Sequence, residues 1–296
     1  MRLLNSGGRL KIVSATGLVD VEEASGGLFG HDPQAVYQRW EAFREWAAGL
    51  GAGAGEVTDL SHVGAPVPRP AQVFAIGLNY LDHADESGLD VPDEPMVFTK
   101  FQSSFAGPSG EIVLPPGNVD WEVEMVVVIG RTARNIAERD AWSHVAGLTV
   151  GQDLSERARQ MRGPAPQFSL AKSHPGFAPM GPAMVTLDEV DNPDDLAVEC
   201  RINGEIVQSA RTSDMIFPVP RLLAYLSRIV TLLPGDLIFT GTPPGVGMGR
   251  SPQRYLQPGD VLETYVEGVG RMVHHLVSAP GASSDDSQLA ASLIVT

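Results

Sequence analysis

The chain has 296 residues, of which 43% are hydrophobic, and its formal net charge at pH 7 is −15. This length and composition are typical of a globular protein that can bury a sizeable core. The acidic balance argues against nucleic acid and against an anionic membrane as partners, because both attract basic surfaces.

Two further features bear on the compartment. No apolar run approaches the length of a membrane-spanning helix, and the first residues lack the apolar segment of a secretory signal. The one cysteine, Cys200, cannot form an internal disulfide, which is compatible with a reducing environment. We therefore expect a cytoplasmic protein.

The N-terminal part predicts a small α/β domain over residues 1–68. Residues 9–20 have the pattern of two short strands around a turn, and Asp32 and Pro33 have the pattern of a helix start. The proline-rich stretch 66–70 then has the composition of a linker, so we place a domain boundary there.

A buried strand is predicted next, and a polar stretch that contains His83 and Glu86 follows it. If residues 80–87 form a helix, these two side chains lie three apart on one face, where the carboxylate can orient the imidazole. A general base needs this arrangement. On its own, the pair is also explained by a surface histidine beside an acidic residue.

Two glutamates open the most apolar segment of the chain. Glu122 and Glu124 precede a run of β-branched and apolar residues that ends at Gly130, the pattern of a buried strand. Because strand side chains alternate, both carboxylates project from one face. A hard cation with oxygen ligands would relieve their repulsion. The alternative is a solvated strand end.

A third acidic residue, Asp153, ends the next predicted strand. Arg157 and Gln160 follow four and seven residues later, so a helical turn would place all three on one side. A carboxylate, a guanidinium and an amide on one face suit a metal together with an anionic substrate.

The remaining motifs are single residues and turns. Lys172 is a lone lysine in an apolar setting, and Asn203-Gly204 is a strong hairpin signal. The loop over residues 240–247 offers backbone N–H groups and hydroxyls to a carboxylate, but it lacks the lysine of a nucleotide-binding loop. Residues 279–296 are small and polar, so we expect a tail.

Several stretches, taken together in chain order, match one family. They are Ile76-Gly77-Leu78-Asn79-Tyr80 with His83 and Glu86, Asp120-Trp121-Glu122-Val123-Glu124, Asp153-Leu154-Ser155-Glu156-Arg157 with Gln160, Lys172-Ser173, Asn203-Gly204-Glu205, Pro234-Gly235-Asp236 and Thr240-Gly241-Thr242-Pro243. On these motifs the chain resembles the fumarylacetoacetate hydrolase family over roughly residues 70–277.

The resemblance implies a role for each motif. A divalent cation, Mg²⁺ or Mn²⁺, would be held by Glu122, Glu124 and Asp153. His83 and Glu86 would form a catalytic dyad. The expected substrate-binding residues are Arg157, Gln160, Lys172 and Thr242, of which Lys172 would also be catalytic.

The resemblance also implies a fold. We expect an α+β, mostly β protein whose catalytic domain, residues 69–278, is a roll of mixed β-sheets, and which pairs as a homodimer. Four positions depart from the common pattern: Gln152 stands where asparagine is frequent, Glu156 and Ala158 alter the usual Ser-Ala-Arg-Asp, and Pro175 replaces an aspartate. The Glu156 and Ala158 pattern resembles members that act on diketo acids derived from deoxy sugars.

These residues favour a metal-dependent hydrolase that cleaves a C–C bond in a 2,4-dioxo acid, of the acylpyruvate or diketo-deoxy-sugar-acid type. The substrate would be a small anionic 2-oxo acid. Decarboxylation of an oxaloacetate-like acid and keto–enol isomerisation of a 2-hydroxydienedioate use the same enolate chemistry and stay open as alternatives. A further alternative is a homologue that keeps the metal and the fold but only binds its ligand.

Overall fold

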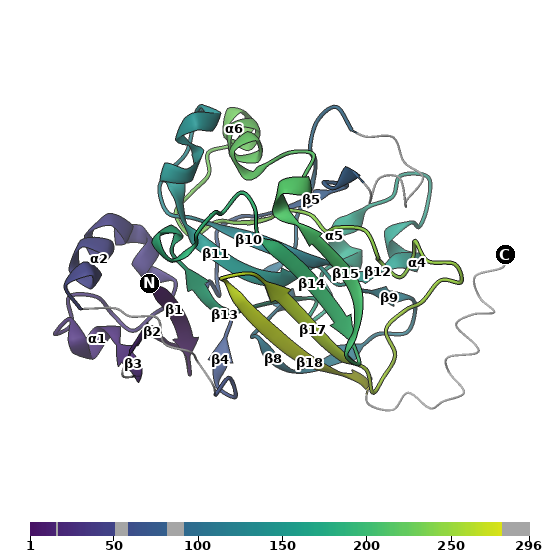
Figure 1. The fold of residues 1–296 in the computed structure, drawn as a ribbon, viewed down its shortest axis with the longest axis horizontal. Coiled ribbons are helices and arrows are strands. Elements are labelled where there is room, and N and C mark those ends of the chain that lie inside the picture. The colour runs from purple at the N-terminus through teal and green to yellow at the C-terminus, as the bar shows by residue number, and fades with distance from the viewer. Residues whose placement is uncertain (16, 51–58, 82–91, 280–296) are drawn as a thin grey trace.

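The computed structural model describes residues 1–15, 17–50, 59–81 and 92–279. Strands dominate these residues (Figure 1). They are β1 Arg2–Ser6, β2 Arg9–Ser14, β3 Gly17–Asp20, β4 Val63–Gly64, β5 Val73–Gly77, β6 Met96–Phe98, β7 Phe105–Ala106, β8 Ser109–Leu114, β9 Val119–Asp120, β10 Val123–Ile129, β11 Val145–Gln152, β12 Ser155–Glu156, β13 Ala178–Val185, β14 Ala197–Ile202, β15 Glu205–Arg211, β16 Leu237–Phe239, β17 Val261–Val266 and β18 Gly270–Ser278.

The helices are short. The α-helices are α1 Val21–Ala24, α2 Trp40–Ala47, α4 Arg157–Gln160, α5 Phe168–Ala171 and α6 Val219–Ile229. The 3₁₀ helices are η1 Ala35–Arg39, η2 Ala48–Leu50, η3 Gln102–Ser104, η4 Glu138–His144, η5 Leu187–Glu189 and η6 Thr212–Asp214. None of the helices in the described ranges is long and apolar enough to cross a membrane.

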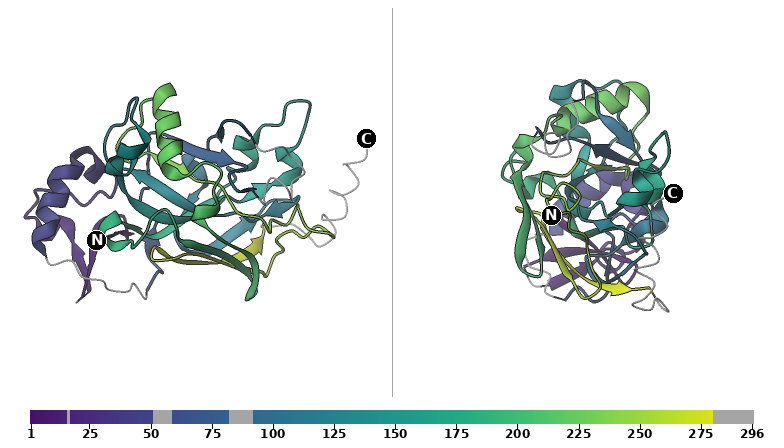
Figure 2. Two further views of the ribbon diagram at one scale, coloured as in Figure 1. Left: turned by 45° about the horizontal axis from the view of Figure 1, so that its top comes forward. Right: turned by 90° about the vertical axis from the view of Figure 1, so that its right-hand side faces the viewer.

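Two mixed sheets and one short ribbon make up the β structure. The larger sheet has the order β3-β2-β1-β13-β11-β10-β16-β5-β6, with β4 on β1 and β7 on β13. The second has the order β15-β14-β17-β18-β8 and packs across the first, while β9 and β12 form the ribbon (Figures 1 and 2). The prediction of a mostly β protein with mixed sheets is confirmed.

Strand β10 is apolar from Met125 to Ile129 because both of its faces are buried. Met125 and Val127 belong to the core that lies against the second sheet. Val126 and Val128 belong to a second core, which includes Trp40 of α2. A strand that is covered on both sides has apolar residues at successive positions, which explains the apolar run that ends at Gly130.

The N-terminal residues extend the main sheet. Arg2 in β1 pairs with Val185 in β13, and β4 pairs with the later residues of the same edge of β1, while β2 pairs with the opposite edge. The helix predicted at Asp32 and Pro33 begins later, as η1 followed by α2. Asp32 instead caps a turn, since its Oδ1 accepts a bond from the N–H of Gln34 at 3.0 Å. A separate domain over 1–68 stays a prediction.

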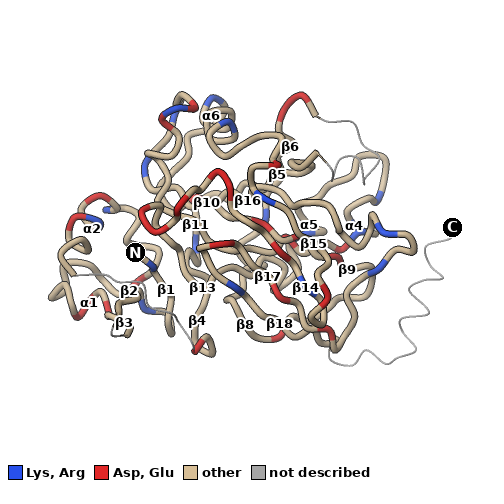
Figure 3. Tube along the Cα trace, in the orientation of Figure 1, with Lys and Arg blue, Asp and Glu red and all other residues tan. Residues whose placement is uncertain are grey.

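The hairpin predicted at Asn203-Gly204 joins β14 to β15, with both turn residues at positive φ, +54° and +81°. Acidic residues occur along the whole trace, from the α1–α2 segment to the second sheet, rather than on one face (Figure 3). The surface acidity therefore does not single out one face as a binding site.

Candidate metal and substrate site

Three buried carboxylates meet where β10 begins and β11 ends. The two strands pair antiparallel, with Val123 opposite Gln152, so the residues just outside this pair are also neighbours. The N–H of Asp153 donates to the carbonyl oxygen of Glu122 at 2.9 Å. One carboxylate oxygen from each of Glu122, Glu124 and Asp153 lies within 4.8 Å of the others. The sequence-predicted ligands are thus brought together.

Two lysine side chains reach this cluster. The Nζ of Lys172 lies 2.6 Å from Oε2 of Glu122 and 2.8 Å from Oδ2 of Asp153. Burial opposes the charge of Lys172, but the two carboxylates outweigh it and raise its pKa. Lys100 contacts the other oxygen of Asp153 and the main-chain carbonyl of Lys172, and burial lowers its pKa.

Lys100 was not singled out from the sequence. A signal was present, because the chain contains only three lysines and Lys100 follows a short apolar strand segment. Its side chain is fully buried, and a buried ammonium requires a charged or polar partner. The partner is Asp153, which lies 53 positions away.

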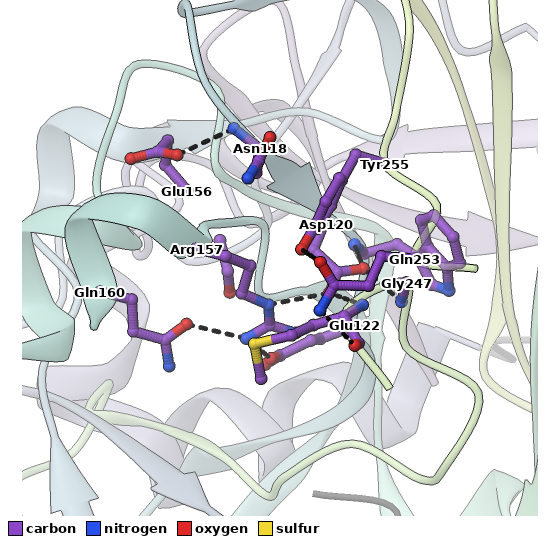
Figure 4. A network of polar contacts seen from close by, with 12 residues as sticks. Asn118, Asp120, Glu122, Glu156, Arg157, Gln160, Gly247, Gln253 and Tyr255 are labelled. Carbon is purple, nitrogen blue, oxygen red and sulfur yellow. Dashed lines mark hydrogen bonds and ion pairs between the residues drawn. The ribbon is translucent and has the colours of Figure 1, made fainter. Parts of the chain in front are cut away.

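On the other side of Glu122 stands Arg157. Its Nη1 lies 2.7 Å from Oε1 of Glu122 and 2.9 Å from Oε1 of Gln160, and its Nε lies 2.8 Å from Oδ2 of Asp120 (Figure 4). Arg157 and Gln160 therefore share one side of α4, as the spacing predicted. The prediction that a helical turn also carries Asp153 is wrong, because residues 155–156 form strand β12 and α4 begins only at Arg157. Burial opposes the charge of Arg157, but Asp120 and Glu122 raise its pKa above the ordinary value.

The loop after β16 closes the site beside Glu124. The N–H of Gly241 donates to Oε2 of Glu124 at 2.8 Å. Gly241 has a φ of +96°, and a Cβ there would lie 2.7 Å from the Cβ of Asn79, so the close approach needs glycine. The hydroxyl of Thr242 accepts a bond from Nε2 of Gln208 at 2.8 Å. Both groups thus have partners within the protein.

The departure at Gln152 has a structural explanation. Its Oε1 accepts a bond from the N–H of Glu122 at 2.8 Å. Its Nε2 donates to the hydroxyl of Thr264 at 3.1 Å and contacts the sulfur of Cys200 at 3.3 Å, so the side chain joins the carboxylate strand to the second sheet. Glu156 caps α4, accepting bonds from the N–H groups of Ala158 and Arg159. Nothing in the structure explains Pro175.

His83 and Glu86 lie outside the described residues. The chain that leads toward them is anchored at Asn79, which is fully buried. Its amide donates to the carbonyl oxygens of Phe217 and Thr240, at 3.1 and 2.7 Å, and accepts from the N–H of Phe217 at 2.8 Å. Asn79 therefore ties the start of this segment to the end of β16.

The donor set fits a divalent cation. Four buried carboxylates, from Asp120, Glu122, Glu124 and Asp153, face three buried cationic side chains. Glu124 forms no ion pair with a lysine or arginine of the described residues. Burial, and then the charges of Asp153 and Glu122, raise its pKa well above the usual range. Hard oxygen ligands of this kind suit Mg²⁺ or Mn²⁺.

The chain is similar to proteins of one family. The profile of the family described as "Fumarylacetoacetate (FAA) hydrolase C-terminal" matches residues 72–277. Human mitochondrial oxaloacetate tautomerase FAHD2A is 48% identical over 224 residues, covering 75% of this chain and 70% of that protein. The 2,4-didehydro-3-deoxy-L-rhamnonate hydrolase of Sphingomonas sp. (strain SKA58) is 50% identical over 211 residues, covering 70% and 73%.

Solved structures of related proteins have the same fold as this chain. A structure from Mycobacterium smegmatis named after the protein HpcE has a TM-score of 0.90 and 58% identity, and it covers 94% of this chain and 100% of that one. Maleylpyruvate hydrolase from Sphingobium sp. SYK-6, in complex with manganese(II) and pyruvate, has a TM-score of 0.76 and 28% identity, with coverages of 94% and 100%.

Proposed function

Because this chain belongs to the fumarylacetoacetate hydrolase family and is an enzyme of that family, we propose that it is a divalent-metal-dependent hydrolase of a 2,4-dioxo acid. The observation that carries the proposal is the buried triad of Glu122, Glu124 and Asp153 beside Lys172 and Arg157. The carboxylate oxygens of the triad can bind a cation, and the two cationic side chains next to them can bind an anion.

The proposed reaction consumes one water molecule. Water adds to the carbonyl carbon C4, the bond between C3 and C4 breaks, C4 leaves as a carboxylic acid, and C3 takes up a proton to give a 2-oxo acid. A divalent cation held by Glu122, Glu124 and Asp153 would supply positive charge for the 2-oxo-carboxylate end and for the enolate that forms there. Mg²⁺ and Mn²⁺ are both proposed, the latter supported by the manganese in the maleylpyruvate hydrolase structure.

The chain's own residues have separate tasks in this proposal. Arg157 and Lys172 orient the anionic substrate, because their charges lie next to the carboxylate triad, and Gln160 contacts Arg157. Thr242 is proposed to help bind the substrate on the support of the family motif. His83, oriented by Glu86, takes the proton from the attacking water. The assignment of these last two residues is supported by the sequence motif and the family.

The substrate class is supported by one relative. The Sphingomonas protein is named for a 2,4-didehydro-3-deoxy sugar acid and is 50% identical over the matched region. This agrees with the Glu156 and Ala158 pattern. We therefore propose a diketo acid derived from a deoxy sugar, or an acylpyruvate, as the substrate.

Keto–enol tautomerisation of oxaloacetate is the second candidate. It is favoured by the 48% identity to the human oxaloacetate tautomerase. Tautomerisation moves one proton between carbon and oxygen and does not need an attacking water. The two candidates therefore differ in their need for a general base that acts on water.

One set of assays separates them. The purified protein, loaded with Mg²⁺ or Mn²⁺, is given an acylpyruvate, a 2,4-dioxo-3-deoxy sugar acid and oxaloacetate. Hydrolysis releases pyruvate or another 2-oxo acid plus a second acid, whereas tautomerisation changes the enol absorbance without forming new products. Tautomerisation alone would replace the proposal by its second candidate, and absence of turnover on all three substrates would refute both.

Two variants then separate metal binding from water activation. Glu122→Ala should weaken cation binding and turnover together, because it removes a ligand. His83→Ala leaves the three carboxylates in place, so it should bind the metal and oxalate nearly normally but lose on the order of 10² to 10⁴ in hydrolysis rate. Hydrolysis by His83→Ala at the wild-type rate would remove the dyad from the mechanism.

We also propose a homodimer and a cytoplasmic location. The homodimer is supported by the family resemblance, and light scattering should then give twice the chain mass of 31.5 kDa. The location is supported by the single buried Cys200. Cell fractionation with an antibody against the protein tests it.

A further inference from the structure

Asp120 is a buried carboxylate that the proposed mechanism leaves without a task. It lies at the end of β9 and is fully buried. Its Oδ1 accepts bonds from the N–H groups of Trp121 and Gly247, at 2.8 and 2.7 Å. Its Oδ2 accepts bonds from the N–H of Met248 at 3.0 Å and from Nε of Arg157 at 2.8 Å. Four donors therefore surround one carboxylate.

The contact with Arg157 fixes the direction of the guanidinium. Nε is held by Asp120, and Nη1 is held by Glu122 and Gln160. The remaining nitrogen, Nη2, is buried and has no hydrogen-bond partner among the residues that the structure describes. A buried cationic donor without a partner is costly, so a ligand oxygen is the partner that the arrangement calls for.

Asp120 also seats the segment over residues 247–255. Gly247 is packed so closely that a Cβ there would lie 1.8 Å from the carbonyl oxygen of Arg254 and 2.8 Å from Oδ1 of Asp120. Within the segment, the hydroxyl of Tyr255 donates to Oε1 of Gln253 at 3.0 Å, and Nε2 of Gln253 donates to the carbonyl oxygen of Met248 at 3.0 Å. Figure 4 shows Gln253 and Tyr255 beside Asp120 and Arg157.

We propose that Asp120 is a positioning residue for substrate binding. It holds Arg157 with Nη2 directed at an oxygen of the anionic substrate, and it seats the 247–255 segment against the same guanidinium. The inference rests on the proposed function, since it assumes that Arg157 meets a 2-oxo acid. A neutral amide at position 120 would turn an N–H group toward at least one of the four donors, so both connections would weaken.

The test is a double-mutant cycle with pyruvate as the probe. Pyruvate binding to the Mn²⁺-loaded protein is measured by calorimetry for wild type, Asp120→Asn, Arg157→Met and the double variant. Each single change should weaken binding on the order of 10- to 100-fold, the usual effect of losing a hydrogen bond to a charged group. If Asp120 acts through Arg157, the double variant should match Arg157→Met within about twofold.

Asp236→Asn is the matched control. Asp236 is also fully buried and accepts bonds from the N–H groups of Gln72 and Leu233, at 2.9 and 2.7 Å, at a turn outside the site. This variant should lower thermal stability but leave pyruvate affinity unchanged. Asp120→Asn should change pyruvate affinity but change Mn²⁺ affinity, measured by electron paramagnetic resonance, much less, because it removes none of the three proposed metal ligands.

Two results would overturn the proposal. One is an Asp120→Asn effect on pyruvate that persists in full when Arg157 is already Met. The other is a crystal structure of Asp120→Asn in which Arg157 keeps its contacts with Glu122 and Gln160. The crystal structure does not depend on pyruvate. If the wild-type protein does not bind pyruvate, the proposed function is contradicted, but the structure of Asp120→Asn still tests whether Asp120 positions Arg157.

If Asp120→Asn does not fold, Arg157→Lys takes its place. Lysine keeps the charge but has no Nε donor for Asp120, whose bonds to Gly247 and Met248 remain. Pyruvate affinity should then fall about as far as in Arg157→Met. Wild-type affinity in Arg157→Lys would show that charge alone suffices and would overturn the positioning role.

Discussion

Glu124→Gln should stabilise the metal-free protein and at the same time abolish its stabilisation by metal. The oxygens of Glu122, Glu124 and Asp153 lie within 4.8 Å of one another. Two unit charges at that separation repel by about 3.5 kcal/mol at an effective dielectric constant of 20. Lys172 contacts the other two carboxylates and offsets part of this repulsion.

At a pH above the raised pKa of Glu124, where its carboxylate is ionised, the net gain on neutralising it is therefore about 1–3 kcal/mol in the free energy of unfolding without metal. A glutamine can still accept the bond from the N–H of Gly241, so no backbone donor is left without a partner. For a chain of this size the gain corresponds to a rise of about 2–5 °C in the unfolding temperature. In wild type, Mn²⁺ at 1,000 times its Kd adds about 4.1 kcal/mol, which the variant should lose.

The assay is differential scanning calorimetry in EDTA and in MnCl₂. The variant should unfold at a higher temperature than wild type in EDTA and at a lower temperature in MnCl₂, so the order of the two proteins inverts. Glu111→Gln, at an exposed position on β8, is the control and should follow wild type in both conditions. A lower unfolding temperature in EDTA would refute the repulsion argument, and an undiminished Mn²⁺ shift would show that Glu124 is not a ligand.

Two further changes test buried groups. Burial lowers the pKa of His274 from 6.5 to about 4. As pH falls from 6.5 to 4, the unfolded chain binds a proton at this histidine before the folded protein does. About 3 kcal/mol of the free energy of unfolding should therefore be lost over this range. Urea titrations across this range should show a flatter profile for His274→Gln than for wild type, with the exposed His275→Gln unchanged; an equally steep profile would contradict the assignment. Lys100→Met leaves Oδ1 of Asp153 without its ammonium partner, while Lys172 still contacts Oδ2. The change should cost on the order of 3 kcal/mol of metal-free stability at pH 8, measured by urea unfolding, whereas a loss under about 1 kcal/mol would show that the Lys100 pair contributes little.

Local patterns were enough to predict the parts of the site that depend on strand and helix geometry. The alternation of side chains at the start of β10 placed Glu124, and Glu122 just before the strand, on one face. The helical spacing placed Arg157 beside Gln160. The hairpin at Asn203-Gly204 followed from turn chemistry alone. These features depend on residues only a few positions apart, whose relative placement the backbone geometry fixes.

The other half of the site depends on contacts between distant segments. Lys100 meets Asp153 only because of how the strands and loops pack in three dimensions, and Asp120 meets Gly247 across 127 positions. The same holds for β1, whose pairing with β13 draws the N-terminal strands into the main sheet.

The amino-acid sequence by itself therefore determined the family, the mostly β fold and the three acidic residues that the structure brings together, because each is encoded in a motif or a period. Only the tertiary structure decided which cation neutralises which carboxylate and which carboxylate orients Arg157. The order of the strands decides which distant residues come into contact. A buried charge that has lost its hydration is costly unless one of these residues pairs with it.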